Sequence, residues 1–230
     1  MSDPVYIDAA LPSSNPFQVY FFIKNKYVRL YYTPGTSGDE LLTPLELVST
    51  GFPSLAGTPF AEQGIDGCFN TEGSEAYIFS GKNCAYIDYA PNTGNDKILQ
   101  GPSTIAEMFP DLRNTVFAEG LDGAFRSTIG KEVYIFKGEK YTRITYDTKL
   151  RIIDILDIPE GFPVLKGTIF ENGIDACFSS HVENEVYLFK GDDYVRMKVT
   201  PHATNDTLVG DVTPIVEGWP PLKGIVPVTE

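Results

Sequence analysis

The sequence predicts an all-β fold, a four-bladed β-propeller that occupies residues 1–230 as a single domain. Three observations lead to this prediction: one set of motifs recurs four times in the same order, each copy is rich in strand-forming residues, and each copy carries a pair of small residues at the same place. Four units of about 57 residues fill the chain and leave no long linker. A radial arrangement suits such repeats, because it leaves only short, protected strand edges.

The first motif of each unit is an apolar residue, an aspartate and two small residues. Its four copies are Ile7-Asp8-Ala9-Ala10, Ile65-Asp66-Gly67-Cys68, Leu121-Asp122-Gly123-Ala124 and Ile174-Asp175-Ala176-Cys177. We expect each copy to belong to the innermost strand of a blade, because converging blades leave no room for large side chains near the axis.

The second motif, Tyr-x-Phe, predicts the next strand, because aromatic and β-branched residues alternate around it. Its copies are Tyr20-Phe21-Phe22, Tyr77-Ile78-Phe79, Tyr134-Ile135-Phe136 and Tyr187-Leu188-Phe189. A hairpin turn and a third strand follow, and this strand carries Tyr-x-Arg except in unit two, which has Cys84 and Tyr86 instead. The arginines are expected to be structural and to pair with acids of neighbouring blades; they are Arg29, Arg143 and Arg196.

The third motif is an aromatic-proline corner that closes each unit. Its copies are Gly51-Phe52-Pro53, Met108-Phe109-Pro110, Gly161-Phe162-Pro163 and Gly218-Trp219-Pro220. A short helix is expected before the corner, for instance over Ser103–Met108, so each blade should hold about four antiparallel strands plus a short helix. The approximate blade boundaries are 5–61, 62–118, 119–171 and 172–226. A linear solenoid would need capping units with a different outer face, and neither end of the chain looks different.

These motifs, read together over all four units, resemble the hemopexin repeat. The chain also resembles the legume seed albumin-2 proteins, on the segments Tyr6–Ala10, Cys84–Pro91 and Gly224–Pro227. The resemblance implies a four-bladed propeller with Ca²⁺, Na⁺ or Cl⁻ ions along its central channel and no known catalysis. It also implies binding of spermine and haem, exchange between a homodimer and a monomer, and links to polyamine metabolism and oxidative stress.

Two rings of residues are expected to hold the channel ions. In the family the backbone carbonyl of the motif aspartate contacts the ion, and these positions correspond to Asp8, Asp66, Asp122 and Asp175. A second family position, deeper in the channel, corresponds to Ala10, Cys68, Ala124 and Cys177. A ring of carbonyl oxygens suits hard cations such as Ca²⁺. For the aspartate side chains we favour a structural role instead, as caps that bond local amides.

A second acidic set predicts a polyamine site. Glu62, Glu119 and Glu171 each lie three or four residues before the inner-strand aspartate, which could place them near one mouth of the channel. Carboxylates near aromatic rings provide the charge pairing and cation–π contact that spermine needs. The competing interpretation is an acidic surface that only keeps the protein soluble.

Composition and missing motifs exclude several functions. The formal net charge of −13 argues against binding to nucleic acid or to an anionic membrane. The N-terminal residues lack the features of a signal peptide and there are only three cysteines, so a cytosolic protein with free thiols is expected. No nucleophile elbow, zincin helix or P-loop motif is present, so we expect no enzyme.

The physiological ligand stays open at this stage. His181 and His202 are the histidines that could ligate haem iron, and ordinary surface roles are the simpler interpretation of both. The alternatives to a ligand-binding albumin are a seed storage protein with incidental binding and a lectin-like protein with shallow pockets between blades.

Overall fold

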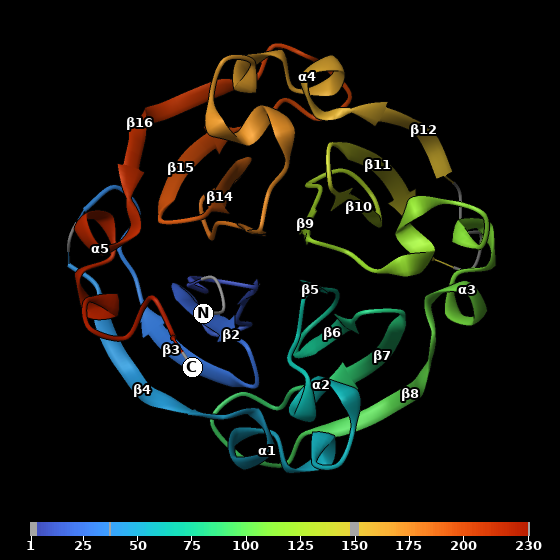
Figure 1. The fold of residues 1–230 in the computed structure, drawn as a ribbon, viewed down its shortest axis with the longest axis vertical. Helices are drawn as coiled ribbons and strands as arrows, with labels where there is room; N and C mark the ends of the chain where they lie inside the picture. The colour runs from blue at the N-terminus through green and yellow to red at the C-terminus, as the bar shows by residue number, and fades with distance from the viewer. Residues whose placement is uncertain (1–3, 37, 148–151, 230) are drawn as a thin grey trace.

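The computed structural model of the protein describes residues 4–36, 38–147 and 152–229. Within these residues sixteen strands form four antiparallel sheets of four strands each, arranged around one axis (Figure 1). Each sheet pairs its strands in chain order and falls inside one of the units expected from the sequence. The all-β, four-bladed propeller is therefore confirmed.

Each blade runs outward from a short inner strand to a longer rim strand (Figure 1). The inner strands are β1 (Ala9–Pro12), β5 (Gly67–Asn70), β9 (Gly123–Arg126) and β13 (Ala176–Ser179). The second strands, which carry Tyr-x-Phe, are β2 (Gln18–Ile23), β6 (Glu75–Ser80), β10 (Glu132–Lys137) and β14 (Glu185–Lys190). The third strands are β3 (Lys26–Tyr31), β7 (Asn83–Asp88), β11 (Lys140–Thr145) and β15 (Asp193–Lys198). The rim strands are β4 (Glu40–Leu47), β8 (Lys97–Thr104), β12 (Ile152–Asp157) and β16 (Thr207–Pro214).

An irregularity in strand pairing accompanies the Tyr-x-Arg motif. In every blade the register between the third strand and the rim strand shifts at this position, for example between Tyr141 and Arg143 in blade three and between Cys84 and Tyr86 in blade two, which lacks the motif. A β-bulge bends a strand and increases its twist. The recurring bulge therefore turns the rim strand away from the flat plane of the sheet.

Short helices follow each rim strand, and in the first three blades they lead into the next blade. Four-residue α-helices follow the rim strands: α1 (Val48–Gly51), α3 (Ile105–Met108), α4 (Ile158–Gly161) and α5 (Ile215–Gly218). The proline corners form 3₁₀ turns: η1 (Pro53–Leu55), η2 (Pro110–Leu112), η4 (Pro163–Leu165) and η6 (Pro220–Leu222). A further turn precedes the next inner strand in three places: α2 (Pro59–Glu62), η3 (Val116–Glu119) and η5 (Ile169–Asn172). The helix expected over Ser103–Met108 begins only at Ile105, because Thr104 is its N-cap and forms a capping box with Glu107.

The core is divided among the four junctions between neighbouring blades. One cluster of buried side chains joins blades one and two, and equivalent clusters join the other pairs of neighbours. Residues alternate along the inner strands, so Ala9 packs toward blade two whereas Ala10 packs toward blade four. Each blade is therefore stabilised mainly by its two neighbours.

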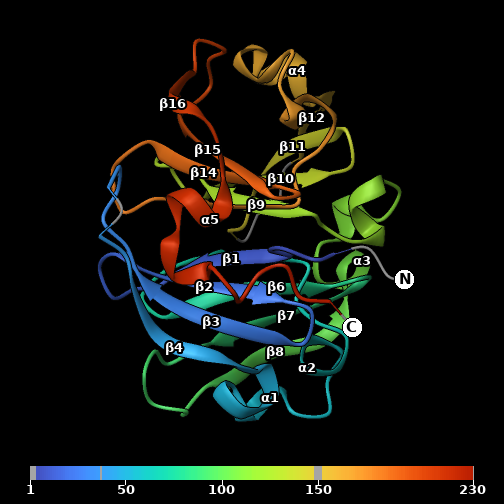
Figure 2. The same ribbon diagram turned by 60° about the vertical axis from the view of Figure 1, so that its left-hand side comes forward.

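The ends of the chain meet at the junction of blades one and four. Val5 and Val228 form an isolated antiparallel bridge, with hydrogen bonds of 3.3 and 2.8 Å between their backbone atoms. The two ends of the described chain lie close together in both ribbon views (Figure 2). Trp219 completes this junction: its ring lies 5.0 Å from that of Phe21 in blade one and 5.2 Å from that of Tyr187 in blade four.

The departures of unit two from the repeat are explained by a packing pair. In blades one, three and four the third-strand tyrosine lies against the glycine before the aromatic corner. A Cβ built on Gly161 would stand 1.7 Å from the Tyr141 hydroxyl, so no larger residue fits there. In blade two the smaller Cys84 replaces the tyrosine, and Met108 occupies the glycine position and packs against the cluster that contains Cys84. The two substitutions compensate for each other in volume.

Candidate functional site

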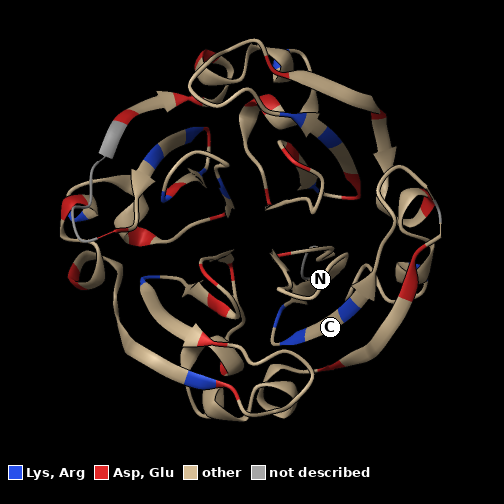
Figure 3. Ribbon diagram, turned by 180° about the vertical axis from the view of Figure 1, so that it is seen from behind, with Lys and Arg blue, Asp and Glu red and all other residues tan. Residues whose placement is uncertain are grey.

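The motif aspartates, one from each blade, gather at one mouth of the axis. A cavity of about 250 Å³ is lined by the four aspartates together with Gly81, Gly120 and Lys137. Acidic segments lie near the centre of the ring when it is seen from behind (Figure 3). We call this cavity the axial mouth.

Each aspartate side chain also caps the hairpin turn of its own blade. The carboxylates accept backbone N–H groups at the ends of the second strands, from Lys24 at 2.5 Å, Gly81 at 2.6 Å, Gly138 at 2.6 Å and Gly191 at 2.8 Å. The capping role expected for the side chains is confirmed by these contacts. The same bonds hold the four carboxylates around the axis.

Blade-to-blade contact at the mouth requires glycine. Gly120 has a φ of 139°, and a Cβ placed on it would come within 3.2 Å of the Gly81 carbonyl oxygen of the preceding blade. Gly173 approaches the Gly138 carbonyl in the same way, with a φ of 133°. Because the two backbones approach so closely, the motif aspartate two residues after each of these glycines lies beside the neighbouring blade.

The carboxylates of the mouth affect one another electrostatically. Burial raises the pKa of Asp8, and the charges of Asp66 and Asp175 add to this increase. Burial also raises the pKa of Asp66, with a smaller contribution from Asp122. Lys137 pairs with Asp122, so four carboxylates and one ammonium leave a formal charge of −3 at the mouth. A cation entering the mouth would relieve this repulsion.

The second predicted ring is buried below the mouth. Ala10, Cys68, Ala124 and Cys177 are each no more than 2% exposed. All three cysteines are free thiols, as expected. Burial raises the pKa of the Cys68 and Cys177 thiols, and the neighbouring Cys68 adds to the shift at Cys177. Protonated thiols are poor metal ligands, so ion binding at this depth would depend on main-chain oxygens.

The side chains alone do not form a metal centre. Among the described residues, no group of three or more His, Cys, Asp or Glu side chains is close enough to hold a metal ion. The aspartate carboxylates are already bonded to turn amides. The donor set that suits Ca²⁺ here is therefore the main-chain oxygen ring predicted from the sequence, and ion binding by these positions stays a prediction.

The glutamates predicted to bind a polyamine have other contacts. Glu119 forms an ion pair with Lys82 at 2.7 Å, and Glu171 accepts the N–H of Gly167 at 2.5 Å. Glu62 is exposed at the end of α2. The residues that line the axial mouth do not include these three. Their role in polyamine binding stays a prediction.

His181 joins blade four to blade one. Its Nδ1 lies 2.8 Å from the Tyr32 hydroxyl, its Nε2 lies 2.9 Å from the Ser13 carbonyl oxygen, and its backbone N–H donates to the Tyr32 hydroxyl at 3.0 Å. Because a carbonyl only accepts, Nε2 carries the proton and Nδ1 accepts from Tyr32. Both ring nitrogens are thus engaged, and haem ligation by His181 would break this junction. His202 bonds Glu132 through Nε2 at 2.7 Å.

Acidification is expected to weaken the junction that His181 makes. Burial lowers the pKa of His181 below its usual 6.5, so the unfolded chain binds this proton more readily than the folded protein. The stabilisation is present above pH 6.5 and is lost as the pH falls below that value. Urea unfolding at pH 7.5 and 5.5 should show a larger loss for the wild type than for His181→Gln. The two proteins share all other titrating groups, so an identical pH dependence would contradict this role.

Three further cavities lie at the rim, between neighbouring blades. Each is lined by the Tyr-x-Phe tyrosine, the third-strand tyrosine and arginine, the aromatic corner, and a loop of the next blade. Their volumes are about 510 Å³ between blades four and one, 240 Å³ between blades one and two, and 190 Å³ between blades three and four. The Tyr-x-Arg motif is the sequence signal that marks these cavities, because its tyrosine and arginine line each of them.

Two of the arginines at these cavities pair with an acid of their own blade. Arg143 contacts Glu132 at 3.2 Å and Arg196 contacts Glu185 at 3.4 Å, in both cases an acid on the adjacent second strand. For Arg143 and Arg196 the expectation of pairing with acids of neighbouring blades was wrong. Arg29 and Arg143 also lie over the rings of Tyr20 and Tyr134, at 5.8 and 5.9 Å.

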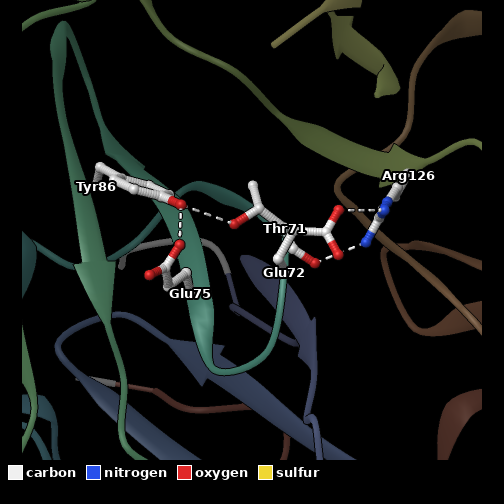
Figure 4. A network of polar contacts seen from close by, with 5 residues as sticks. All are labelled: Thr71, Glu72, Glu75, Tyr86 and Arg126. Carbon is white, nitrogen blue, oxygen red and sulfur yellow. Dashed lines mark hydrogen bonds and ion pairs between the residues drawn. The ribbon is translucent and has the colours of Figure 1, made fainter. Parts of the chain in front are cut away.

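In blade two a tyrosine takes the place of this arginine. The Tyr86 hydroxyl donates to Glu75 and lies 3.2 Å from the Thr71 hydroxyl (Figure 4). Arg126 of blade three reaches back to the Thr71 carbonyl at 2.6 Å and to Glu72 at 2.8 Å. This junction therefore contains an inter-blade ion pair where its counterparts have a cavity-lining arginine.

Comparisons with known proteins agree with this architecture. The chain is 50% identical over 228 residues to Albumin-2 of Pisum sativum, which covers 99% of both chains. A hemopexin fold protein from cow pea is 66% identical, with a TM-score of 0.94 over 98% of this chain and all of the other. A plant lectin with two metal binding sites from Cicer arietinum is 52% identical, with a TM-score of 0.94 over 97% of this chain and all of the other. No protein-family model matches the chain. None of the described helices is long and apolar enough to cross a membrane.

Proposed function

Because this chain belongs to the Albumin-2 family of seed albumins, we propose that it is a non-enzymatic ligand-binding protein that holds a cation on its propeller axis. The observation that carries this proposal is the axial mouth, where one aspartate from each of the four blades lines a single cavity. Four carboxylates that line one cavity create a potential that attracts cations to the axis, and burial together with the neighbouring carboxylates raises the pKa of Asp8 and Asp66.

The main-chain ring would coordinate the ion and the carboxylates would attract it. We assign Ca²⁺ to the carbonyl oxygens of Asp8, Asp66, Asp122 and Asp175, and a second channel ion to those of Ala10, Cys68, Ala124 and Cys177. Main-chain oxygen donors at the start of four inner strands suit Ca²⁺, which takes six to eight oxygen ligands and accepts flexible geometry. The related lectin with two metal binding sites supports this assignment.

Spermine and haem remain proposed ligands, in a cytosolic protein that exchanges between dimer and monomer. Spermine is a cation, so the acidic surface of the protein supports its binding. For haem we assign no axial ligand, since His181 is occupied by Tyr32 and Ser13.

A lectin is the second candidate function. The rim cavities recur at three junctions, and a protein with several similar sites can cross-link cell surfaces without forming an oligomer. The similarity to a plant lectin favours this candidate.

Metal analysis tests the axial site. After dialysis against buffered Ca²⁺ and then metal-free buffer, elemental analysis should find bound calcium in the wild type. Asp66→Asn should retain it, because its carbonyl survives and its amide oxygen can still accept the Gly81 N–H. Saturation at about 100 times Kd should raise the unfolding free energy by about 2.7 kcal/mol.

Two outcomes would count against this proposal. If the wild type held no calcium and adding calcium did not change its stability, the assignment of an axial ion would be wrong. If only Asp66→Asn lost calcium, the ligands would be the aspartate side chains and not the main-chain oxygens. Glu119→Gln, which removes one negative charge from an exposed ion pair with Lys82 outside the mouth lining, is the matched control for the change in net charge.

A further inference from the structure

The rim cavity between blades one and two contains an arginine without an acidic partner. The cavity measures about 240 Å³, and Tyr20, Arg29, Glu46 and Phe52 of blade one line it together with the loop 89–94 of blade two. It lies at the junction beside α1 (Figure 1). We call it the arginine cavity.

The sequence of blade one lacks the acid that the other blades provide for this arginine. A glutamate stands two residues before the Tyr-x-Phe tyrosine in blades two, three and four, as Glu75, Glu132 and Glu185. Blade one has Gln18 at this position, and Gln18 lies opposite Tyr31 just as Glu132 lies opposite Thr145. In blades three and four this glutamate forms an ion pair with the arginine of the third strand. Gln18 therefore leaves Arg29 without its counter-charge.

The contacts of Arg29 agree with this missing charge. Arg29 forms no ion pair with any residue that the structure describes, whereas Arg143 and Arg196 each have one. The Arg29 Nε and the Gln18 Oε1 are both shielded from solvent, and neither has a hydrogen-bond partner. The Nε of Arg143 also lacks an aligned hydrogen bond, but a carboxylate oxygen of Glu132 lies 3.2 Å from it. Because an amide carries no charge, even a bond between Gln18 and Arg29 would leave the guanidinium uncompensated.

The groups closest to Arg29 do not neutralise it either. Its guanidinium carbon lies 5.8 Å from the centre of the Tyr20 ring. Burial raises the pKa of Tyr20, and the charge of Arg29 and a hydrogen bond from it oppose this rise, so Tyr20 stays neutral. Glu46 lines the same cavity, but its Oε1 accepts from the Tyr27 hydroxyl at 2.5 Å and it makes no ion pair with Arg29.

The arginine cavity is also the least acidic of the three rim cavities. One arginine and one glutamate line it. The cavity between blades four and one is lined by one arginine and three acids, and the cavity between blades three and four by one arginine, one histidine and two acids. In a protein with a net charge of −13, a partly buried cation in such a cavity is the place where an anionic ligand meets the least repulsion.

We propose that the arginine cavity binds a small organic monocarboxylate, with the Arg29 guanidinium as its counter-charge and the rings of Tyr20 and Phe52 against its carbon skeleton. The planar guanidinium matches the geometry of a carboxylate and can donate two parallel hydrogen bonds to it. Glu46 in the same cavity disfavours a dianion such as phosphate. The volume lies below the usual range for drug-sized ligands, so only a small molecule or a single side group fits.

The carboxylate can come from a free organic acid or from the C-terminus of another chain. The site is separate from the axial mouth and takes a ligand of the opposite charge. The inference therefore goes beyond the proposed axial cation and does not depend on it.

A titration followed by ¹⁹F NMR, with 4-fluorobenzoate as the probe, tests this site on the full chain at low salt. The wild type should bind the probe, and Arg29→Gln should weaken binding roughly ten- to a hundredfold, as expected for loss of a charged hydrogen bond. Competition with acetyl-Gly-Phe distinguishes the two sources. An affinity similar to that of the probe would identify a C-terminal carboxylate, and a much weaker affinity a free acid.

Gln18→Glu provides a second test that does not remove the arginine. It restores the glutamate that blades three and four carry, so the fold should be kept and Arg29 should gain an internal partner. We expect this variant to lose binding of 4-fluorobenzoate at least tenfold, because the new carboxylate competes for the same guanidinium and repels the ligand.

The matched controls change the net charge equally at exposed positions outside the cavity. Arg113→Gln and Gln63→Glu should both bind the probe as the wild type does. The proposal would be overturned if the wild type did not bind the probe, if either Arg29→Gln or Gln18→Glu bound it unchanged, or if inorganic phosphate displaced it more effectively than benzoate. Calcium content is measured on the same samples, so failure of this site is distinguishable from failure of the axial site.

Discussion

Trp219→Ala should destabilise the protein by about 3–5 kcal/mol, the range for removing a large aromatic side chain from a core. The Trp219 ring is 2% exposed and lies among rings of blade one and blade four, including Phe21 at 5.0 Å and Tyr32 at 5.6 Å. Its removal opens a cavity where the two ends of the ring meet. For a chain of this size we expect the melting temperature to fall by roughly 6–20 °C, measured by circular dichroism.

Trp219→Phe is the matched control, because phenylalanine occupies this corner in the other three blades. We expect it to cost roughly 1–2 kcal/mol, since most of the aromatic contact remains. If Trp219→Ala lowered stability no more than Trp219→Phe, the closing role of this residue would be refuted. A two-step melting curve for the alanine variant would show that the blades no longer unfold together.

Gly161→Met and Tyr141→Cys should each be strongly destabilising, whereas the double variant should regain much of the loss. The methionine alone overlaps the Tyr141 ring, whose hydroxyl stands 1.7 Å from a Cβ built on Gly161. The cysteine alone leaves a void in the cluster around Phe162. We expect a cost of about 2–4 kcal/mol for each single change. The double variant reproduces the pair found in blade two, Cys84 and Met108.

Urea unfolding of the four proteins in this cycle measures the coupling directly. A coupling free energy of about 1–3 kcal/mol in the compensating direction is expected for residues in contact. If the two changes in unfolding free energy were additive, a larger residue at position 161 would not compensate for a smaller one at position 141. Gly210→Ala, at a glycine with open space around it but a φ of 87°, reports the cost of backbone strain without overlap.

The sequence was sufficient for the architecture because the same side chain meets the same physical demand in every blade. Converging inner strands require small residues such as Ala9 and Gly67, and the hairpin turn requires the capping aspartate. These requirements are local to one unit, so they recur at a fixed spacing and remain visible without the structure. The capping role of the aspartates and the free, buried cysteines could be predicted for the same reason.

The tertiary structure decided which groups from different units meet. Arg143 pairs with Glu132 within its blade and not across a junction, because the adjacent strand brings that acid closer. His181 contacts Tyr32, 149 positions away, only because the ring closes between blades four and one. The rim cavity between blades four and one likewise combines Asp39 from one blade with Tyr187 from another.

Packing between units decides how deeply these side chains are buried and which of their hydrogen-bonding atoms have a partner. The spacing of residues within one unit does not encode either property. The same holds for unit two, where Cys84 and Met108 are 24 positions apart in the sequence. The compensation of their volumes becomes visible only in the structure, where the helix after the rim strand packs on the third strand. The periodic sequence determined the blades, their order and the ring of aspartates. The junctions between blades, where the candidate ligand groups converge, were determined by three-dimensional closure of the ring.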